Sequence, residues 1–157
     1  MGLDFGERRI GVALSDAERM IATGLLTIDR KKTPDALAAL GDIIAKKKVT
    51  AIVIGYPLRT DGVKKAGAKT EAVDAFVEEL KVRFDLPVHL EDEAFTSSMA
   101  AETLKSRKQP RRPKTPKDWA RDKAEIDRVA ACFILQDWLD HAGAAPSPRA
   151  NGGGATP

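Results

Sequence analysis

The sequence predicts one α/β domain with a mixed sheet and helices on both of its faces. Three closely spaced β-type runs open the chain, which favours an antiparallel meander. Helical and strand patterns then alternate, as they do in parallel β-α-β units. The length, 157 residues, is enough for one domain with a hydrophobic core.

The first half of the chain supplies most of the expected sheet and one helix. Three short strands are expected, at 2–5, 10–15 and 21–28. Thr33 is suited to an N-cap and Pro34 to the first helical position, so a helix is expected from there to about residue 47. The apolar run at 51–55 is typical of a buried parallel strand.

The second half is expected to add one strand and three helices. We expect helices at 66–84, 97–106 and 119–139, and a buried strand at 87–90. The domain is therefore assigned to residues 1–141. Residues 142–157 are rich in small residues, Pro and Gly, which predicts a disordered C-terminal tail.

Composition excludes several classes of protein. No apolar run approaches the length of a membrane span and the N-terminus has no signal-peptide pattern, so we expect a soluble cytoplasmic protein that binds no membrane. The single cysteine, Cys132, excludes an internal disulfide and a cysteine-based zinc site. It falls within a helical pattern and is expected to be a packing residue.

Three acidic residues carry most of the functional information. Asp4 lies on the first strand, Glu93 follows the last strand, and Asp127 precedes the apolar stripe of the last helix. Acids at such positions are held by rigid scaffold, and oxygen ligands are what Mg²⁺ or Mn²⁺ prefers. The main hypothesis is a catalytic site that binds two such ions with its substrate and cleaves phosphodiesters.

Each acid also has a purely structural interpretation. Asp4 could satisfy turn amides, and Asp127 could be a surface residue beside Arg128. Neighbouring residues of a strand point to opposite sides, so only one of Asp92 and Glu93 should face a site, and we favour Glu93.

Basic residues are placed where they could hold a nucleic-acid backbone. Arg8 and Arg9 follow the first strand, and Lys123 lies one helical turn before Asp127, where it contacts a phosphate or pairs with that acid. The segment 107–117 contains three prolines and no acid, so it is either a solvated loop or an arm that neutralises phosphates. Its basic residues are Arg107, Lys108, Arg111, Arg112, Lys114 and Lys117.

Four motifs, in this order, resemble the YqgF (RuvX) family. They are GLDFGERRIGVALSD (2–16), GYPLRTDG (55–62), DEAFTSS (92–98) and IDRVAACFILQ (126–136). Members of this bacterial family are described as Holliday junction resolvases and as nucleases that mature the 5′ end of pre-16S rRNA. The resemblance spans about residues 1–140 and implies a metal-dependent nuclease with an RNase H-like fold, built on a five-stranded mixed sheet.

The resemblance also implies roles for individual residues. Asp4, Glu93 and Asp127 match the three acids of the family, the last of which opens the final helix. Arg9 matches a basic position after the first strand. The glycine–proline loop of the family, which we interpret as a substrate loop, is matched by Gly55, Pro57, Asp61 and Gly62.

The sequence departs from the family pattern at two places. Ala94 and Phe95 stand where the family usually has Arg and Leu, which keeps open an inactive nucleic-acid-binding protein as an alternative. Only Met1 precedes Gly2, whereas the first strand of the family normally begins several residues earlier. Either the true start lies upstream of Met1 or the central strand is clipped.

We therefore expect a metal-dependent endonuclease that acts on structured nucleic acid, either an rRNA precursor or branched DNA. Processing of the 5′ end of pre-16S rRNA is favoured over Holliday junction cleavage in recombination, because two symmetric nicks require a dimer. A monomer and a homodimer both remain open. A phosphotransferase of the actin or sugar-kinase type is disfavoured, because it needs two such domains to enclose a nucleotide.

Overall fold

A computed structural model describes residues 1–57, 67–93, 99–100, 102–103 and 115–144. Its centre is a five-stranded sheet with the strand order β3-β2-β1-β4-β5. The strands are β1 (Gly2–Phe5), β2 (Arg9–Ser15), β3 (Ala22–Asp29), β4 (Ile52–Tyr56) and β5 (Val88–Asp92). The first three form the predicted antiparallel meander, and β4 and β5 are added parallel to β1.

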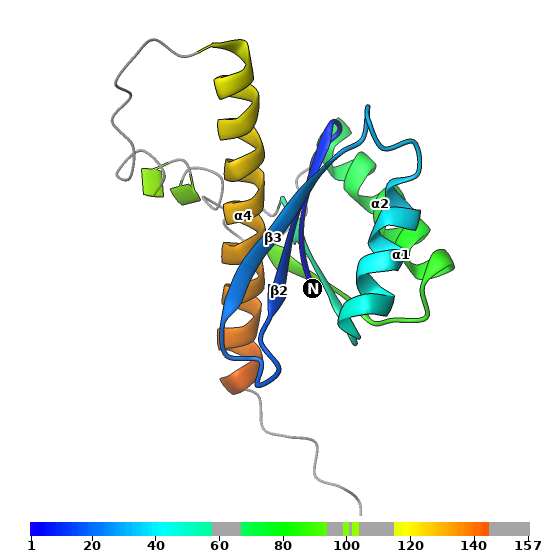
Figure 1. Cartoon of the computed structure of the whole chain (residues 1–157). Coiled ribbons are helices and arrows are strands. Elements are labelled where there is room, and N and C mark those ends of the chain that lie inside the picture. The colour runs from blue at the N-terminus through cyan, green and yellow to red at the C-terminus, as the bar shows by residue number, and fades with distance from the viewer. Residues whose placement is uncertain (58–66, 94–98, 101, 104–114, 145–157) are drawn as a thin grey trace, which may run out of the picture.

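Helices cover both faces of this sheet, so the predicted α/β class, a five-stranded mixed sheet flanked by helices, is confirmed. The helices are α1 (Ala36–Lys47), α2 (Ala68–Arg83) and α4 (Pro116–Ala144). Figure 1 shows α1 and α2 together on one face and the long α4 on the other. The described residues at 99–100 and 102–103 are helical, and the rest of the helix expected at 97–106 lies outside the described residues, as does the tail beyond Ala144.

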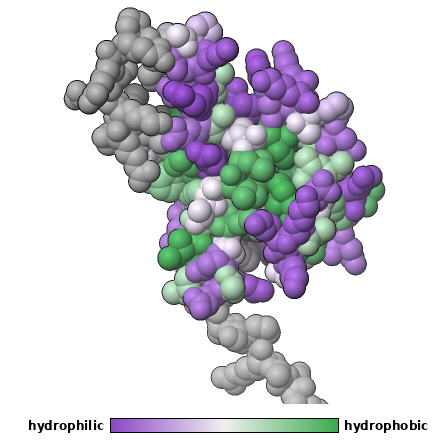
Figure 2. All heavy atoms as spheres, in the orientation of Figure 1, coloured by the Kyte–Doolittle hydropathy of each residue, from purple (hydrophilic) through white to green (hydrophobic). Residues whose placement is uncertain are grey.

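Two hydrophobic layers result from the alternation of side chains along the strands. Leu3 and Phe5 of β1 pack with Leu80 and the rest of the layer under α1 and α2. On the other face, Val53 packs with Ile134 of α4. Figure 2 shows hydrophilic residues over the outer surfaces of the helices, with hydrophobic residues visible mainly between the two helical layers.

Cys132 belongs to the layer under α4, as expected of a packing residue. Its partial burial raises the pKa of the thiol, which keeps the side chain protonated and apolar. Among the described helices, none combines the length and the hydropathy that a membrane span requires.

The start of α1 differs from the prediction. Asp35, and not Thr33, is the N-cap, because the Asp35 carboxylate accepts a hydrogen bond of 2.8 Å from the backbone N–H of Ala38. The backbone N–H of Thr33 is instead used in the preceding turn, where it donates to the carbonyl oxygen of Asp29 at 2.9 Å.

The predicted start of α4, at residue 119, was also too late, because the helix begins at Pro116. Thr115 and Asp118 exchange hydrogen bonds, and Pro116 occupies the first helical position. This reciprocal arrangement resembles a capping box, which satisfies donors at the start of a helix.

The prediction that the last strand is buried was also wrong. β5 is the edge strand of the sheet, and Leu90 is 42% exposed. A short apolar run has the same pattern at an edge as in the middle of a sheet, since pairing on one side only leaves no trace in the sequence.

Candidate active site

Asp4 lies on the central strand and is the most perturbed carboxylate of the described residues. Burial is the main cause that raises its pKa to about 7, because an ionised carboxylate loses hydration there. The negative charges of Glu93 and Asp127 raise the pKa further, while the positive charge of Lys69 opposes them. Three acids that are distant in sequence therefore interact electrostatically.

Glu93 is held in place by backbone pairing that continues past the end of β5. Its backbone N–H donates to the carbonyl oxygen of Tyr56 at 3.1 Å. Gly55 leaves room beside it, because a Cβ at Gly55 would lie 3.4 Å from the Cβ of Glu93 and 2.5 Å from Cδ1 of Ile134. Of the two adjacent acids, Glu93 and not Asp92 acts on the pKa of Asp4.

Asp127 is positioned by the packing of α4 against β2. A Cβ at Gly11, the β2 residue opposite Asp4, would lie 2.0 Å from the carbonyl oxygen of Asp127. The expectation that this acid opens the final helix is wrong: the helix begins at Pro116, several turns earlier. A close contact between helix and strand, and not a helix end, brings Asp127 to the sheet.

Two of the three acids have a cationic partner. Nε of Arg9 lies 2.5 Å from Oδ2 of Asp127, and both side chains are about four-fifths buried, with 22% and 20% exposed. Nζ of Lys69 forms an ion pair with Oε1 of Glu93. These cations reduce the repulsion between the acids around Asp4.

Lys123 and Arg128 are the two other cations considered for Asp127. Lys123 is exposed on α4. The side chain of Arg128 lies over Gly24 of β3, where a Cβ would approach its Cγ within 2.5 Å. Arg9 is thus the residue that forms an ion pair with Asp127.

The three carboxylates supply only hard oxygen donors, which fit Mg²⁺ or Mn²⁺. A divalent cation would also relieve the repulsion and the burial penalty at Asp4. Within the described part of the chain, however, no three His, Cys, Asp or Glu side chains are gathered closely enough to form a ready-made metal site. The three acids interact electrostatically, but in this arrangement they do not form a closed set of ligands.

The remaining predicted residues fall into two groups. Arg8 is exposed and lies 3.8 Å from Asp29, Lys117 is exposed in the first turn of α4, and Pro57 is buried after β4. The others lie outside the described residues: Asp61, Gly62, Arg107, Lys108, Arg111, Arg112 and Lys114.

Lys69 is the residue of this site that the sequence analysis missed. One signal was available, because a lysine in the first turn of a helix is unfavourable next to the positive end of the helix dipole. A lysine at this position is therefore expected to have an acidic partner outside its own helix.

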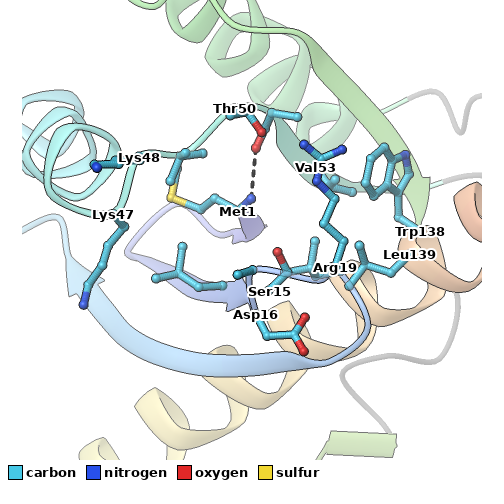
Figure 3. A pocket seen from close by; sticks show the side chains of 15 residues that line it. Met1, Ser15, Asp16, Arg19, Lys47, Lys48, Thr50, Val53, Trp138 and Leu139 are labelled. Atoms are coloured by element: carbon cyan, nitrogen blue, oxygen red, sulfur yellow. Dashed lines mark hydrogen bonds between the residues drawn. The ribbon is translucent and has the colours of Figure 1, made fainter.

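The acids do not line the cavity shown in Figure 3. That cavity, of about 380 Å³, lies beside Met1 where β2 ends and β4 begins, with Ser15, Arg19 and Thr50 in its lining. None of Asp4, Glu93 and Asp127 lines it. The acid cluster is at the other end of β1.

The strand order β3-β2-β1-β4-β5, with helices on both faces of the sheet, defines an α/β protein that carries three interacting acids. The chain belongs to the RuvX family, whose model, described as "Holliday junction resolvase", matches residues 1–141.

Relatives support the same assignment across most of the chain. Proteins named "Putative pre-16S rRNA nuclease" from Crocosphaera subtropica and Roseiflexus sp. are 39% and 42% identical. The alignments cover 89% of this chain in both cases, and 91% and 92% of the two relatives. Two solved structures of Thermus thermophilus RuvC are also similar, one of them in complex with a Holliday junction substrate. Both matches cover 90% of this chain, and they cover 95% and 93% of the RuvC chains. The sequence identities are 13% and 11%, and the TM-scores are 0.47 and 0.49.

Proposed function

We propose that this protein is an endonuclease that depends on Mg²⁺ or Mn²⁺ and cleaves phosphodiesters at Asp4, Glu93 and Asp127. The observation that carries the proposal is the convergence of two further acids on the buried Asp4: Asp127 lies against Gly11, opposite Asp4, and Glu93 lies beside Gly55. Burial and these two acids raise the pKa of Asp4. A buried acid beside two further acids is unfavourable for stability alone, and such perturbed groups concentrate at functional sites.

The residues of this chain have separate tasks in the proposed reaction. When bound, two divalent ions supply an activated water and stabilisation of the leaving oxygen. Asp4 offers its oxygens from the central strand, where ladder hydrogen bonds on both sides fix the backbone. Arg9 orients Asp127 through its ion pair, which pre-organises the ligand set before the metal arrives.

The proposed substrate is structured RNA, at the 5′ end of pre-16S rRNA, in the cytoplasm. The names of the relatives at about 40% identity point to this substrate. Holliday junction cleavage, to which the family description points, is the alternative. It requires two copies of the site related by symmetry, whereas cleavage at one RNA end requires only one.

Basic residues outside the acid cluster are proposed to hold the nucleic-acid backbone without reading its sequence. Arg8, Lys117 and Lys123 are exposed and available for such contacts. The same role is proposed for Arg107, Lys108, Arg111, Arg112 and Lys114, and a substrate-loop role for Asp61 and Gly62 beside Gly55 and Pro57.

A cleavage assay with matched variants tests the proposal. Labelled pre-16S rRNA and four-way junction substrates are incubated with Mn²⁺ or with EDTA. Wild type should cleave only with Mn²⁺, and Asp127→Asn should lose at least about a hundredfold in rate. Asp137→Asn, an exposed acid on the same helix, is the control and should cleave as wild type does.

Equal cleavage by wild type and Asp127→Asn would overturn the assigned site. Binding without any cleavage in Mn²⁺ would instead favour the inactive nucleic-acid-binding protein, to which Ala94 points.

A further inference from the structure

Lys69 joins the exposed surface to the acid cluster. Its side chain is 61% exposed, whereas that of its partner Glu93 is only 12% exposed. Its charge also acts on Asp4, so the ammonium lies near two of the three acids. A cation at this position meets any ligand that approaches the acids from solvent.

The helix that carries Lys69 does not explain its presence. α2 begins at Ala68, so Lys69 lies in the first turn, where the helix dipole disfavours a cation. By contrast, Lys81 and Arg83 lie in the last turn of α2, where the helix dipole favours a cation. An ion pair that is largely exposed on one side contributes little to stability. Neither helix stability nor the ion pair alone accounts for Lys69.

We propose that Lys69 is a phosphate-binding residue of the active site. This proposal rests on the proposed function. In the metal-free protein the ammonium neutralises Glu93. Once the oxygens of Glu93 are committed to a divalent cation, the ammonium is released to donate to a non-bridging oxygen of the substrate phosphate. The length of the lysine side chain and its three donors permit this change of partner.

The change of partner predicts two effects of opposite sign. Without nucleic acid, Lys69 competes with the metal for Glu93, so Lys69→Ala should bind Mn²⁺ several-fold more tightly than wild type. With nucleic acid, the variant lacks a charged hydrogen bond to phosphate, so it should bind the substrate about tenfold more weakly. A lysine that only supports the fold would weaken both kinds of binding.

The experiment measures both quantities on the full chain. Mn²⁺ affinity is measured by titration calorimetry without nucleic acid, and substrate affinity by fluorescence anisotropy with the rRNA precursor and Ca²⁺ in place of Mn²⁺. Lys69→Arg should keep most of the substrate affinity because it keeps the charge. Lys81→Ala is the matched control on the same helix, since its ammonium pairs with Glu78 at 2.9 Å, and it should behave as wild type in both measurements.

Each other outcome contradicts a defined part of the inference. If Lys69→Ala weakens both affinities, or changes neither, Lys69 is not a phosphate-binding residue, and the nuclease proposal stands. If wild type itself binds no Mn²⁺ and cleaves nothing, the proposed function and the role of Lys69 are both overturned.

Discussion

The two faces of the sheet are packed in different ways. Under α1 and α2, large side chains fill the space, and the rings of Phe5 and Phe76 stack at 4.4 Å. Under α4 the helix comes so close that Gly11 leaves no room for a Cβ beside the carbonyl oxygen of Asp127. The first face supplies most of the buried hydrophobic surface, and the second holds the acids.

Strand alternation explains this division of labour. Leu3 and Phe5 belong to the layer under α1 and α2, so Asp4 between them is directed to the face of α4. Glycines at Gly11 and Gly55 let α4 and Glu93 approach Asp4 from two sides. One face therefore stabilises the fold while the other tolerates an unfavourable cluster of charge, and the faces can be perturbed separately.

The largest expected effect is a pH-dependent gain of stability in Asp4→Asn. The pKa of Asp4 is about 7 in the folded protein and 3.8 unfolded, so the folded state binds the extra proton between these values. The stability of wild type should therefore fall as the pH rises from about 4 to about 7, whereas Asn has no such dependence. Above pH 7 and in EDTA, the variant should be more stable by up to ~4 kcal/mol.

Denaturant unfolding at a series of pH values measures this difference. Asp42→Asn, an exposed acid on α1, is the control and should follow wild type throughout. Mn²⁺ should narrow the gap by stabilising wild type alone. Parallel curves for wild type and Asp4→Asn would mean that Asp4 is hydrated and that the two faces do not differ in the proposed way.

A smaller effect on stability is expected when one glycine on each face of the sheet is replaced by alanine. Gly11→Ala places a Cβ 2.0 Å from backbone at Asp127, which cannot move without displacing α4. We expect a loss of about 1–3 kcal/mol in the free energy of unfolding, and slower cleavage because Asp127 shifts.

Gly41→Ala is the matched change on the other face. Its Cβ would lie 3.2 Å from Cε1 of Phe84, a side chain that can give way, and alanine favours the helix. Stability should stay within about 1 kcal/mol of wild type, with cleavage unchanged. If both variants cleave as wild type does, the close approach of α4 has no role in the site.

Local patterns were sufficient to predict most of the fold. The strands follow from short apolar runs, and their observed ends lie within a residue or two of the expected ones. The start of α4 was missed although Thr115, Pro116 and Asp118 form a readable signal. The reason is that the basic, proline-containing segment was interpreted as a loop or arm that continues to residue 117. The edge position of β5 is not local information, since it depends on how the crossover from β4 is placed.

The acids of the site were predictable, but their partners were not. Asp4, Glu93 and Asp127 stand out by residue type and position, and their assignment as metal ligands stays a prediction. Arg9 and Asp127 are 118 residues apart, and Lys69 and Glu93 are 24 apart. These pairs depend on the packing of α4 and on the start of α2, which no sequence period encodes.

The smallest expected effect concerns electrostatic affinity and not stability. Basic residues that precede α4 are expected to contact nucleic acid, whereas Lys46, Lys47 and Lys48 end α1 on the other face. Neutralising Arg111, Arg112 and Lys114 together should reduce the slope of log affinity against log salt by about 2–3, because three phosphate contacts are lost. Neutralising the three α1 lysines is the matched change in charge and should leave the slope unaltered. Equal slopes for both triple variants would mean that long-range charge, and not a contact surface formed by Arg111, Arg112 and Lys114, attracts the substrate.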